Sequence, residues 1–395
     1  MSKESFYGQG PMVIVVFGYD CLEVIYYLRS SGIFSKGRHS IQSGREVAVQ
    51  PRKPLSPSPR RCASRKARSW RIALSPVSVP GFSRRVGTRR RRMEPNQYRL
   101  LEVGFKSLES AGMMLHDADM QTRDRENCPV NNAVGVARAL FANRLSHFLT
   151  SRGPVLWLIQ HVPEAFRDLI YPTTTSNLRQ VNAAIVTASN LYIGPEHLIN
   201  IGRFSNTRSP TTLCHVFDIA ADGYVKAEAV SLIMLKRLED AIRDRNPIHT
   251  VVLGTASTSN GKTLGITSPS SASRALAIRS AYAKARIRDL NSTVYLEARA
   301  TGQQHKLMIL QKSGRWFGVC GNAFGRQMIA HRFSMSHPST DQGIKSNIGH
   351  SGLPAGNSGL IKAILVLENG FIPKTSTFVN PSPKIDFASH SFMYS

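Results

Sequence analysis

A lysine and a histidine five residues apart form the segment of this chain best suited to chemistry. The segment Lys345–His350 has the sequence KSNIGH, and an apolar helix is expected behind it over Gly359–Glu368. A histidine exchanges a proton near neutral pH, and a lysine supplies a positive charge and three hydrogen-bond donors. Two interpretations are open on these residues alone: the pair belongs to an active site, or His350 is a buried structural residue beside Lys345.

The five cysteines offer no second chemical centre by their spacing. They are far apart, contain no CxxC pair and are Cys21, Cys62, Cys128, Cys214 and Cys320. This pattern indicates free thiols in a reducing compartment, with no disulfide framework and no metal site. The apolar stretch Pro11–Leu28 is interrupted by Asp20 and Glu23 and is too short to span a bilayer comfortably. We therefore expect a soluble cytoplasmic protein with no membrane partner.

The positive charge of the chain is concentrated near its N-terminus. The net charge is +26 over 395 residues, and Arg45–Arg92 holds fifteen Lys or Arg against one acidic residue. This stretch is rich in Arg, Ser and Pro and cannot bury enough apolar surface to offset its ordering entropy, so it is expected to be disordered. A nucleic-acid-binding arm and a solvated basic linker both remain open. The linker is favoured because the stretch holds only Trp70 and Phe82 for stacking on bases.

Regular elements are expected on both sides of this stretch. The apolar run Met12–Gly18 predicts a buried strand that ends in a glycine turn. Helical spacing of Leu and Val after Met93, with Gly112 as a stop, predicts a helix. Further strands are expected at three apolar segments and a helix from about residue 273. The three segments start at Val181, Ala229 and Thr293.

Six motifs occur in the order found in the β-ketoacyl synthases, the condensing enzymes of polyketide and fatty-acid assembly. The helix from Met93 resembles the family's "DPQQRLLLEV…ALEDAG", and Cys214–Glu228 resembles "CxxFDxxADGYxRGEG". The other four matches lie around Gly153, Ser259, Lys345 and Asn380. The resemblance covers roughly residues 93–387 and is closest to fungal-type iterative reducing polyketide synthases.

This resemblance implies a thiolase-like α/β fold with layers in the order α-β-α-β-α. It divides the chain into a basic, mostly disordered region 1–92, a ketosynthase-like domain 93–387 and a tail 388–395. The domain is broken at about 155–180 and 303–341, where the family pattern is lost, and its C-terminal part is expected to be missing. The family carries substrates on the phosphopantetheine of an acyl carrier protein, binds no cofactor and is usually homodimeric. Acyl carrier protein and other synthase modules are the implied partners.

The resemblance also implies roles for individual residues. The family uses a nucleophilic cysteine to hold the acyl chain and two histidines to assist decarboxylation of the malonyl unit. His350 corresponds to the second histidine and Lys345 to the lysine that orients it. Glu228 is the expected carboxylate of that network, and Thr301 corresponds to a hydroxyl that faces the pantetheine arm.

Two positions depart from this pattern in a way that affects the chemistry. Counting from Gly153, the nucleophile position holds Val162, which cannot form an acyl-enzyme. Arg299 replaces the first histidine of "EAHGTGT", and arginine cannot shuttle a proton. Cys214 corresponds to a family cysteine that is not the nucleophile, so a core thiol is expected there.

Three hypotheses follow for function. The leading one is a ketosynthase-like domain of polyketide biosynthesis that is inactive in condensation. The alternative is a non-catalytic dimerisation or acyl-thioester-binding module associated with an intact synthase, and nucleic-acid binding ranks last. The abrupt junctions between segments that match the family and segments that do not are also typical of shifted reading frames or retained introns.

Overall fold

The computed structural model describes residues 12–20, 94–112, 140–149, 182–192, 209, 211, 213–263, 270–288, 295–297, 340–369, 373, 375 and 377–383. A four-stranded antiparallel sheet lies at the centre, with strand order β2-β3-β1-β4. Its strands are β1 Met12–Asp20, β2 Ala183–Asn190, β3 Ala229–Arg237 and β4 Thr250–Val252. The predicted strand at Met12 is confirmed and lies inside the sheet, between β3 and β4. The glycine turn expected at Gly18 is wrong, because β1 continues to Asp20 and Gly18 pairs with Leu232 of β3.

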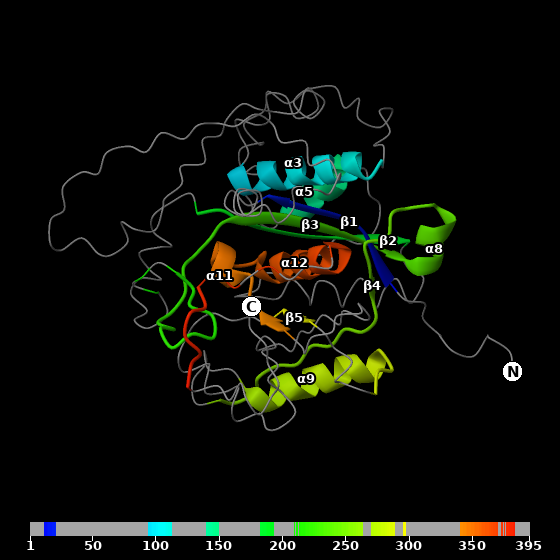
Figure 1. Ribbon diagram of the computed structural model, residues 1–395. Coiled ribbons are helices and arrows are strands. Elements are labelled where there is room, and N and C mark those ends of the chain that lie inside the picture. Colours follow the sequence, from blue (N-terminus) through cyan, green and yellow to red (C-terminus); the bar gives the residue numbers. More distant parts are fainter. Residues whose placement is uncertain are drawn as a thin grey trace, which may run out of the picture.

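Helices and a smaller sheet are arranged around the central sheet in layers. Figure 1 shows α3 (Pro95–Ser110) and α5 (Phe141–Phe148) on one face and α11 (Lys345–Ile348) and α12 (Ala355–Asn369) on the other. The parallel pair β5 (Tyr295–Glu297) and β6 (Thr340–Gln342) follows, and α9 (Ser271–Lys284) lies beyond it. This order agrees with the expected α-β-α-β-α layering.

β3 is buried on both faces because helices cover both sides of the sheet. Its even-numbered residues Val230 and Leu232 pack with Leu100 and Val103 of α3. Its odd-numbered residues Ile233 and Leu235 pack on the opposite face in one cluster with two residues of α12, Leu360 and Ile364. The side chains of a strand alternate between faces, so a strand between two helical layers is apolar at consecutive positions.

β1 is as deeply buried as β3. Met12 and Ile14 join the cluster that faces α12, whereas Val13, Val15 and Val16 pack with Ala241. The proposed boundary at residue 93 leaves Met12–Asp20 outside the ketosynthase-like domain, yet the strand pairs on both edges within the domain's sheet. β1 is therefore an internal strand of the central sheet.

The helix predictions agree with the structure. The helix expected after Met93 is α3, and it is followed by Gly112 at a φ of +69°. The helix expected from residue 273 is α9, whose N-cap Ser270 accepts a hydrogen bond from the Ser273 N–H at 3.2 Å. A serine hydroxyl at this position satisfies a backbone donor that the helix leaves open.

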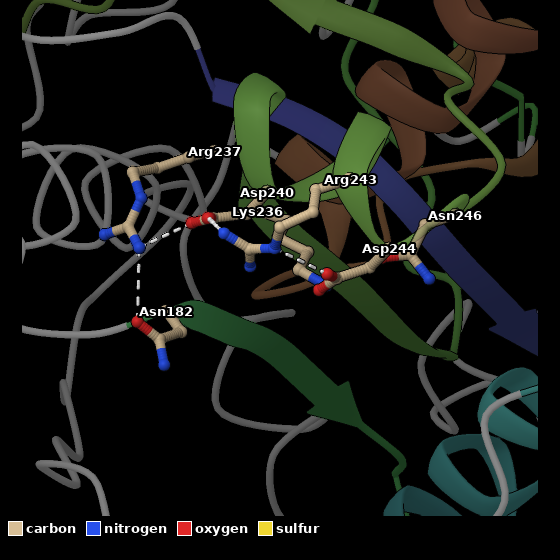
Figure 2. Close-up of polar contacts among 7 residues, drawn as sticks. All are labelled: Asn182, Lys236, Arg237, Asp240, Arg243, Asp244 and Asn246. Atoms are coloured by element: carbon tan, nitrogen blue, oxygen red, sulfur yellow. Dashed lines mark hydrogen bonds and ion pairs between the residues drawn. The ribbon is translucent and has the colours of Figure 1, made fainter.

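A network of charged side chains fastens the short helix α8 (Leu238–Arg243) to the end of β3 (Figure 2). Arg237 contacts Asp240 at 2.5 Å and the side-chain oxygen of Asn182 at 3.1 Å, which ties α8 to the residue before β2. Lys236 contacts Asp244 at 2.5 Å just after the helix. At one end of the sheet, two ion pairs and one hydrogen bond to the neutral Asn182 thus join β3, α8 and the residue before β2.

Within the described residues, no helix is long and apolar enough to cross a membrane. No group of three or more His, Cys, Asp or Glu side chains in the same part of the chain is arranged to hold a metal ion.

Candidate functional site

His350 is placed by the backbone of a neighbouring segment. Its N–H donates to the Val225 carbonyl at 2.7 Å, and its carbonyl accepts from the Ala227 N–H at 3.0 Å. Gly349 precedes it at a φ of +78°, and a Cβ there would lie 2.9 Å from Cγ1 of Val225. Only glycine meets both requirements without strain. The segment 225–227 and the loop Gly349–His350 are thus locked together.

The orientation of the His350 ring is set by a backbone donor. The Gly352 N–H donates to Nδ1 of His350 at 3.1 Å, so Nδ1 carries a lone pair and the neutral ring has its proton on Nε2. The ring lies 5.1 Å from the Tyr224 ring, centroid to centroid, and the residue is only 1% exposed. The ring is therefore held as an Nε2–H donor in a largely dry environment.

A second glycine supports this arrangement. Gly352 has a φ of +71°, and a Cβ there would lie 2.7 Å from Nδ2 of Asn190. Asn190 ends β2 and donates from Nδ2 to the Ser351 carbonyl at 3.0 Å. The strand β2 thereby fixes the turn that carries the donor to His350.

Lys345 is 4% exposed and begins α11, and its charge acts on the thiol of Cys214. Burial raises the pKa of Cys214 to about 11, although a hydrogen bond with the Val225 backbone and the charge of Lys345 oppose this rise. The Val225 N–H lies 3.3 Å from the sulfur. Because the thiolate is the reactive form of cysteine, this buried thiol is poorly suited to act as a nucleophile. Cys214 is a core thiol, as the sequence predicts.

Glu228 lies next to the segment that holds His350. Its carboxylate accepts from the Tyr192 N–H at 2.5 Å. Burial raises the pKa of Glu228, partly offset by this hydrogen bond, and burial also raises the pKa of Tyr192 to about 12. The neighbouring Ala227 and Ala229 both lack a positive φ, so alanine in place of the family's glycines causes no backbone strain.

Three of the expected site residues lie outside the described residues: Val162, Arg299 and Thr301. Of the positions taken from the resemblance, the structure describes Lys345, His350 and Glu228, which lie on α11, the following loop and the segment before β3. The assignment of catalytic roles to Lys345 and His350 stays a prediction.

A buried carboxylate beside this site was not predicted from the sequence. Glu297 ends β5, and its side chain is within 3.4 Å of the Lys362 ammonium group on α12. One signal was present in the sequence. Lys362 is a single charged residue in the apolar run Gly359–Leu367, and buried charges in such runs are normally paired.

A second carboxylate, Asp218, fastens the C-terminal segment to the loop before Tyr224. Asp218 accepts from the N–H groups of Val379 and Asn380, both at 2.7 Å, and from the Ala220 N–H at 2.8 Å. Burial opposes its charge, but these three hydrogen bonds outweigh burial and hold its pKa below the ordinary value. Segment 377–383 thereby supports the loop that leads to Tyr224 and Val225.

Comparison with known proteins agrees with this architecture. Two family models match, the N-terminal domain of β-ketoacyl synthase over residues 175–241 and its C-terminal domain over residues 329–379. A highly reducing polyketide synthase of Eupenicillium brefeldianum is 40% identical over 316 residues, which are 75% of this chain and 13% of that protein. The chain thus spans about an eighth of the length of such relatives.

Solved structures give the same result. The ketosynthase from module 6 of the bacillaene synthase of Bacillus subtilis is 25% identical, with a TM-score of 0.64 over 77% of this chain and 52% of that chain. A second structure of this ketosynthase is 20% identical and has a TM-score of 0.70 over 98% of this chain and 66% of that chain. The mixed α/β fold described above is therefore that of ketosynthase domains. This chain belongs to the β-ketoacyl synthase family, as a ketosynthase domain of the polyketide synthase type.

Proposed function

We propose that this chain is a ketosynthase-like domain that binds acyl thioesters without condensing them. The observation that carries the proposal is the valine at position 162, where the family has its nucleophilic cysteine. In the family reaction a thiolate takes the acyl group from phosphopantetheine, and a malonyl thioester then loses CO₂ and attacks the resulting thioester. A valine side chain has no nucleophilic atom, so the first of these bonds cannot form.

The retained part of the site supports ligand binding. His350 presents an Nε2–H donor because Gly352 occupies Nδ1, and a thioester carbonyl is an acceptor for such a donor. Lys345, five residues earlier in the chain, adds a buried positive charge. The ligands in this proposal are acyl groups on the phosphopantetheine of an acyl carrier protein, with Thr301 toward the pantetheine arm.

Covalent chemistry is tested with an acyl N-acetylcysteamine thioester and a malonyl thioester. We expect the wild-type chain to show no acyl adduct by intact-mass spectrometry and no β-ketoacyl product by chromatography. The variant Val162→Cys should gain the mass of one acyl group, and Val162→Ala is the matched control that should not. Formation of a β-ketoacyl product by the wild-type chain would overturn the inactivity.

Binding is tested separately by calorimetry with an acyl-pantetheine. We expect saturable binding by the wild-type chain and a loss of about tenfold in affinity for His350→Ala, since one hydrogen bond in a buried site contributes about 1–1.5 kcal/mol. Equal affinities of the two proteins would show that His350 does not contribute to binding the ligand. No binding at all by the wild-type chain would refute the binding function.

The same proposal includes a homodimer that associates with polyketide synthase modules. The mass of the purified chain in solution, measured by light scattering after size exclusion, tests this part. A dimer that persists after dilution is expected, and a monomer at all concentrations would contradict it.

A further inference from the structure

The Glu297 carboxylate connects three elements beneath the candidate site. Its side chain is 5% exposed. One oxygen, Oε1, accepts from the Ile344 backbone N–H at 2.6 Å, and Oε2 accepts from the Tyr295 hydroxyl at 2.6 Å. Ile344 directly precedes Lys345, the first residue of α11. The carboxylate therefore holds the residue at which the Lys345–His350 segment begins.

The helix α12 provides the charge and the space for this carboxylate. The Lys362 ammonium group is 3.4 Å from Oε2 of Glu297, and its side chain is 7% exposed. One turn earlier, Gly359 leaves room for Glu297, because a Cβ at that position would lie 3.1 Å from Cγ of Glu297. Burial lowers the pKa of Lys362, an effect that the charge of Glu297 opposes. The two charged side chains are therefore buried together.

We propose that Glu297 and Lys362 are positioning residues that set the place of the His350 loop relative to the central sheet. The chain of contacts is short. Glu297 accepts a hydrogen bond from the Ile344 N–H. The helix α11 ends where the Gly349 N–H donates to the Lys345 carbonyl at 2.9 Å, and His350 is the next residue. The inference rests on the proposed function for what the loop binds, but the positioning itself does not depend on a ligand.

Stability alone is a weak reason for this pair. Removing two charges from water costs several kcal/mol per ion in general, and an apolar pair of similar volume is often as stable or more so. What the charged pair adds is a hydrogen bond of defined direction. A carboxylate accepts a short hydrogen bond from one backbone N–H, and an apolar side chain cannot do this.

The experiment compares two double variants of the full chain that both lack the charges. Glu297→Gln/Lys362→Met keeps an oxygen that accepts from the Ile344 N–H, whereas Glu297→Met/Lys362→Met removes it. Glu368→Gln, which alters a half-exposed carboxylate at the other end of α12, is the control. The measurements are urea unfolding, hydrogen exchange of the Ile344 amide by NMR, and affinity for an acyl-pantetheine.

We expect the Met/Met variant to exchange the Ile344 amide about tenfold faster than the Gln/Met variant and to bind the acyl-pantetheine about tenfold more weakly, at similar global stability. Equal exchange rates in the two variants would overturn the proposal. If the Met/Met variant does not fold, amide exchange in the wild-type chain tests the proposal instead. There the Ile344 amide should exchange no faster than the His350 amide, and faster exchange would refute the positioning role.

The two proposals fail in different ways. If the wild-type chain binds no acyl-pantetheine, the proposed function is refuted and the exchange rates still test the positioning pair. If the ligand binds but exchange at Ile344 is the same in both double variants, the proposed function stands and the positioning pair is refuted.

Discussion

The backbone N–H of Gly352 donates to Nδ1 of His350 at 3.1 Å, and this one contact determines the tautomer of the neutral ring. Nε2 then carries the proton of the neutral imidazole. The donor comes from a residue two positions later, in a turn that requires a φ of +71°. The loop therefore has to adopt a glycine-only conformation before the histidine can present a donor.

The tautomer of His350 is the first prediction. We expect the neutral imidazole of His350 to carry its proton on Nε2, because Nδ1 accepts from the Gly352 N–H. Long-range ¹H–¹⁵N correlation spectra of ¹⁵N-histidine-labelled protein distinguish the two tautomers. His147 is exposed on α5 and serves as an internal reference. A protonated Nδ1 in the neutral ring would contradict the site geometry.

Gly352→Ala should destabilise the domain by about 2 kcal/mol, the sum of left-handed backbone strain and the contact of the new Cβ with Asn190. Gly112→Ala is the matched control. Gly112 has a similar φ of +69°, but nothing lies within 4 Å of an added Cβ, so only the backbone strain of about 1 kcal/mol is expected. Urea unfolding gives both values, and equal losses would show that the contact with Asn190 contributes nothing.

Asp218 should make the stability of the fold depend on acidic pH. Its pKa is lowered in the folded state, so its contribution is fully present above the unfolded-state pKa of about 3.9 and is lost as pH falls through the lower folded-state pKa. Asp218→Asn should cost about 1–3 kcal/mol near neutral pH and should flatten the stability curve below about pH 4.

Unfolding at several pH values measures this effect. Asp244→Asn is the control, because the Asp244 side chain is 38% exposed and its ion pairs with Lys236 and Arg243 are screened by solvent. We expect a much smaller change for it. If Asp218→Asn and the wild-type chain show the same pH dependence of stability, the negative charge of Asp218 does not stabilise the fold through the N–H groups of residues 379 and 380.

Cys214 should resist alkylation in the folded protein. With a pKa of about 11, only about one thiol in three thousand is ionised at pH 7.5, and the residue is 1% exposed. Iodoacetamide labelling followed by peptide mapping should show Cys214 modified only after denaturation. Rapid labelling of Cys214 in the native chain would contradict its assignment as a core thiol and would reopen it as a nucleophile.

Several elements followed directly from the local pattern of residues. The helical spacing after Met93, the apolar run at Met12 and the apolar helix around Gly359 each predicted an element that the structure contains. The motif KSNIGH also identified Lys345 and His350 as site candidates, and the structure buries both. Such features depend on neighbours within a few positions, so the order of residues is enough to reveal them.

Other features needed the folded chain, because the partners are distant in sequence. Glu297 meets Lys362 across 65 positions, and Asp218 meets Val379 across 161. Nothing in the local pattern around Asp218 or Glu297 predicts either partner. The place of β1 between β3 and β4 is a further example, since strand pairing is chosen by long-range packing of both faces.

The amino-acid sequence by itself determined the chemistry that is available: a histidine and a lysine in a glycine-containing loop, and a valine at the predicted nucleophile position. The tertiary structure decided which atoms are presented. It occupied Nδ1 of His350 with a backbone donor, raised the pKa of Cys214 by burial and paired Glu297 with Lys362. The reason is physical: residue type fixes the donors, acceptors and charges, whereas their orientation and their exposure to water depend on groups that only folding brings within contact.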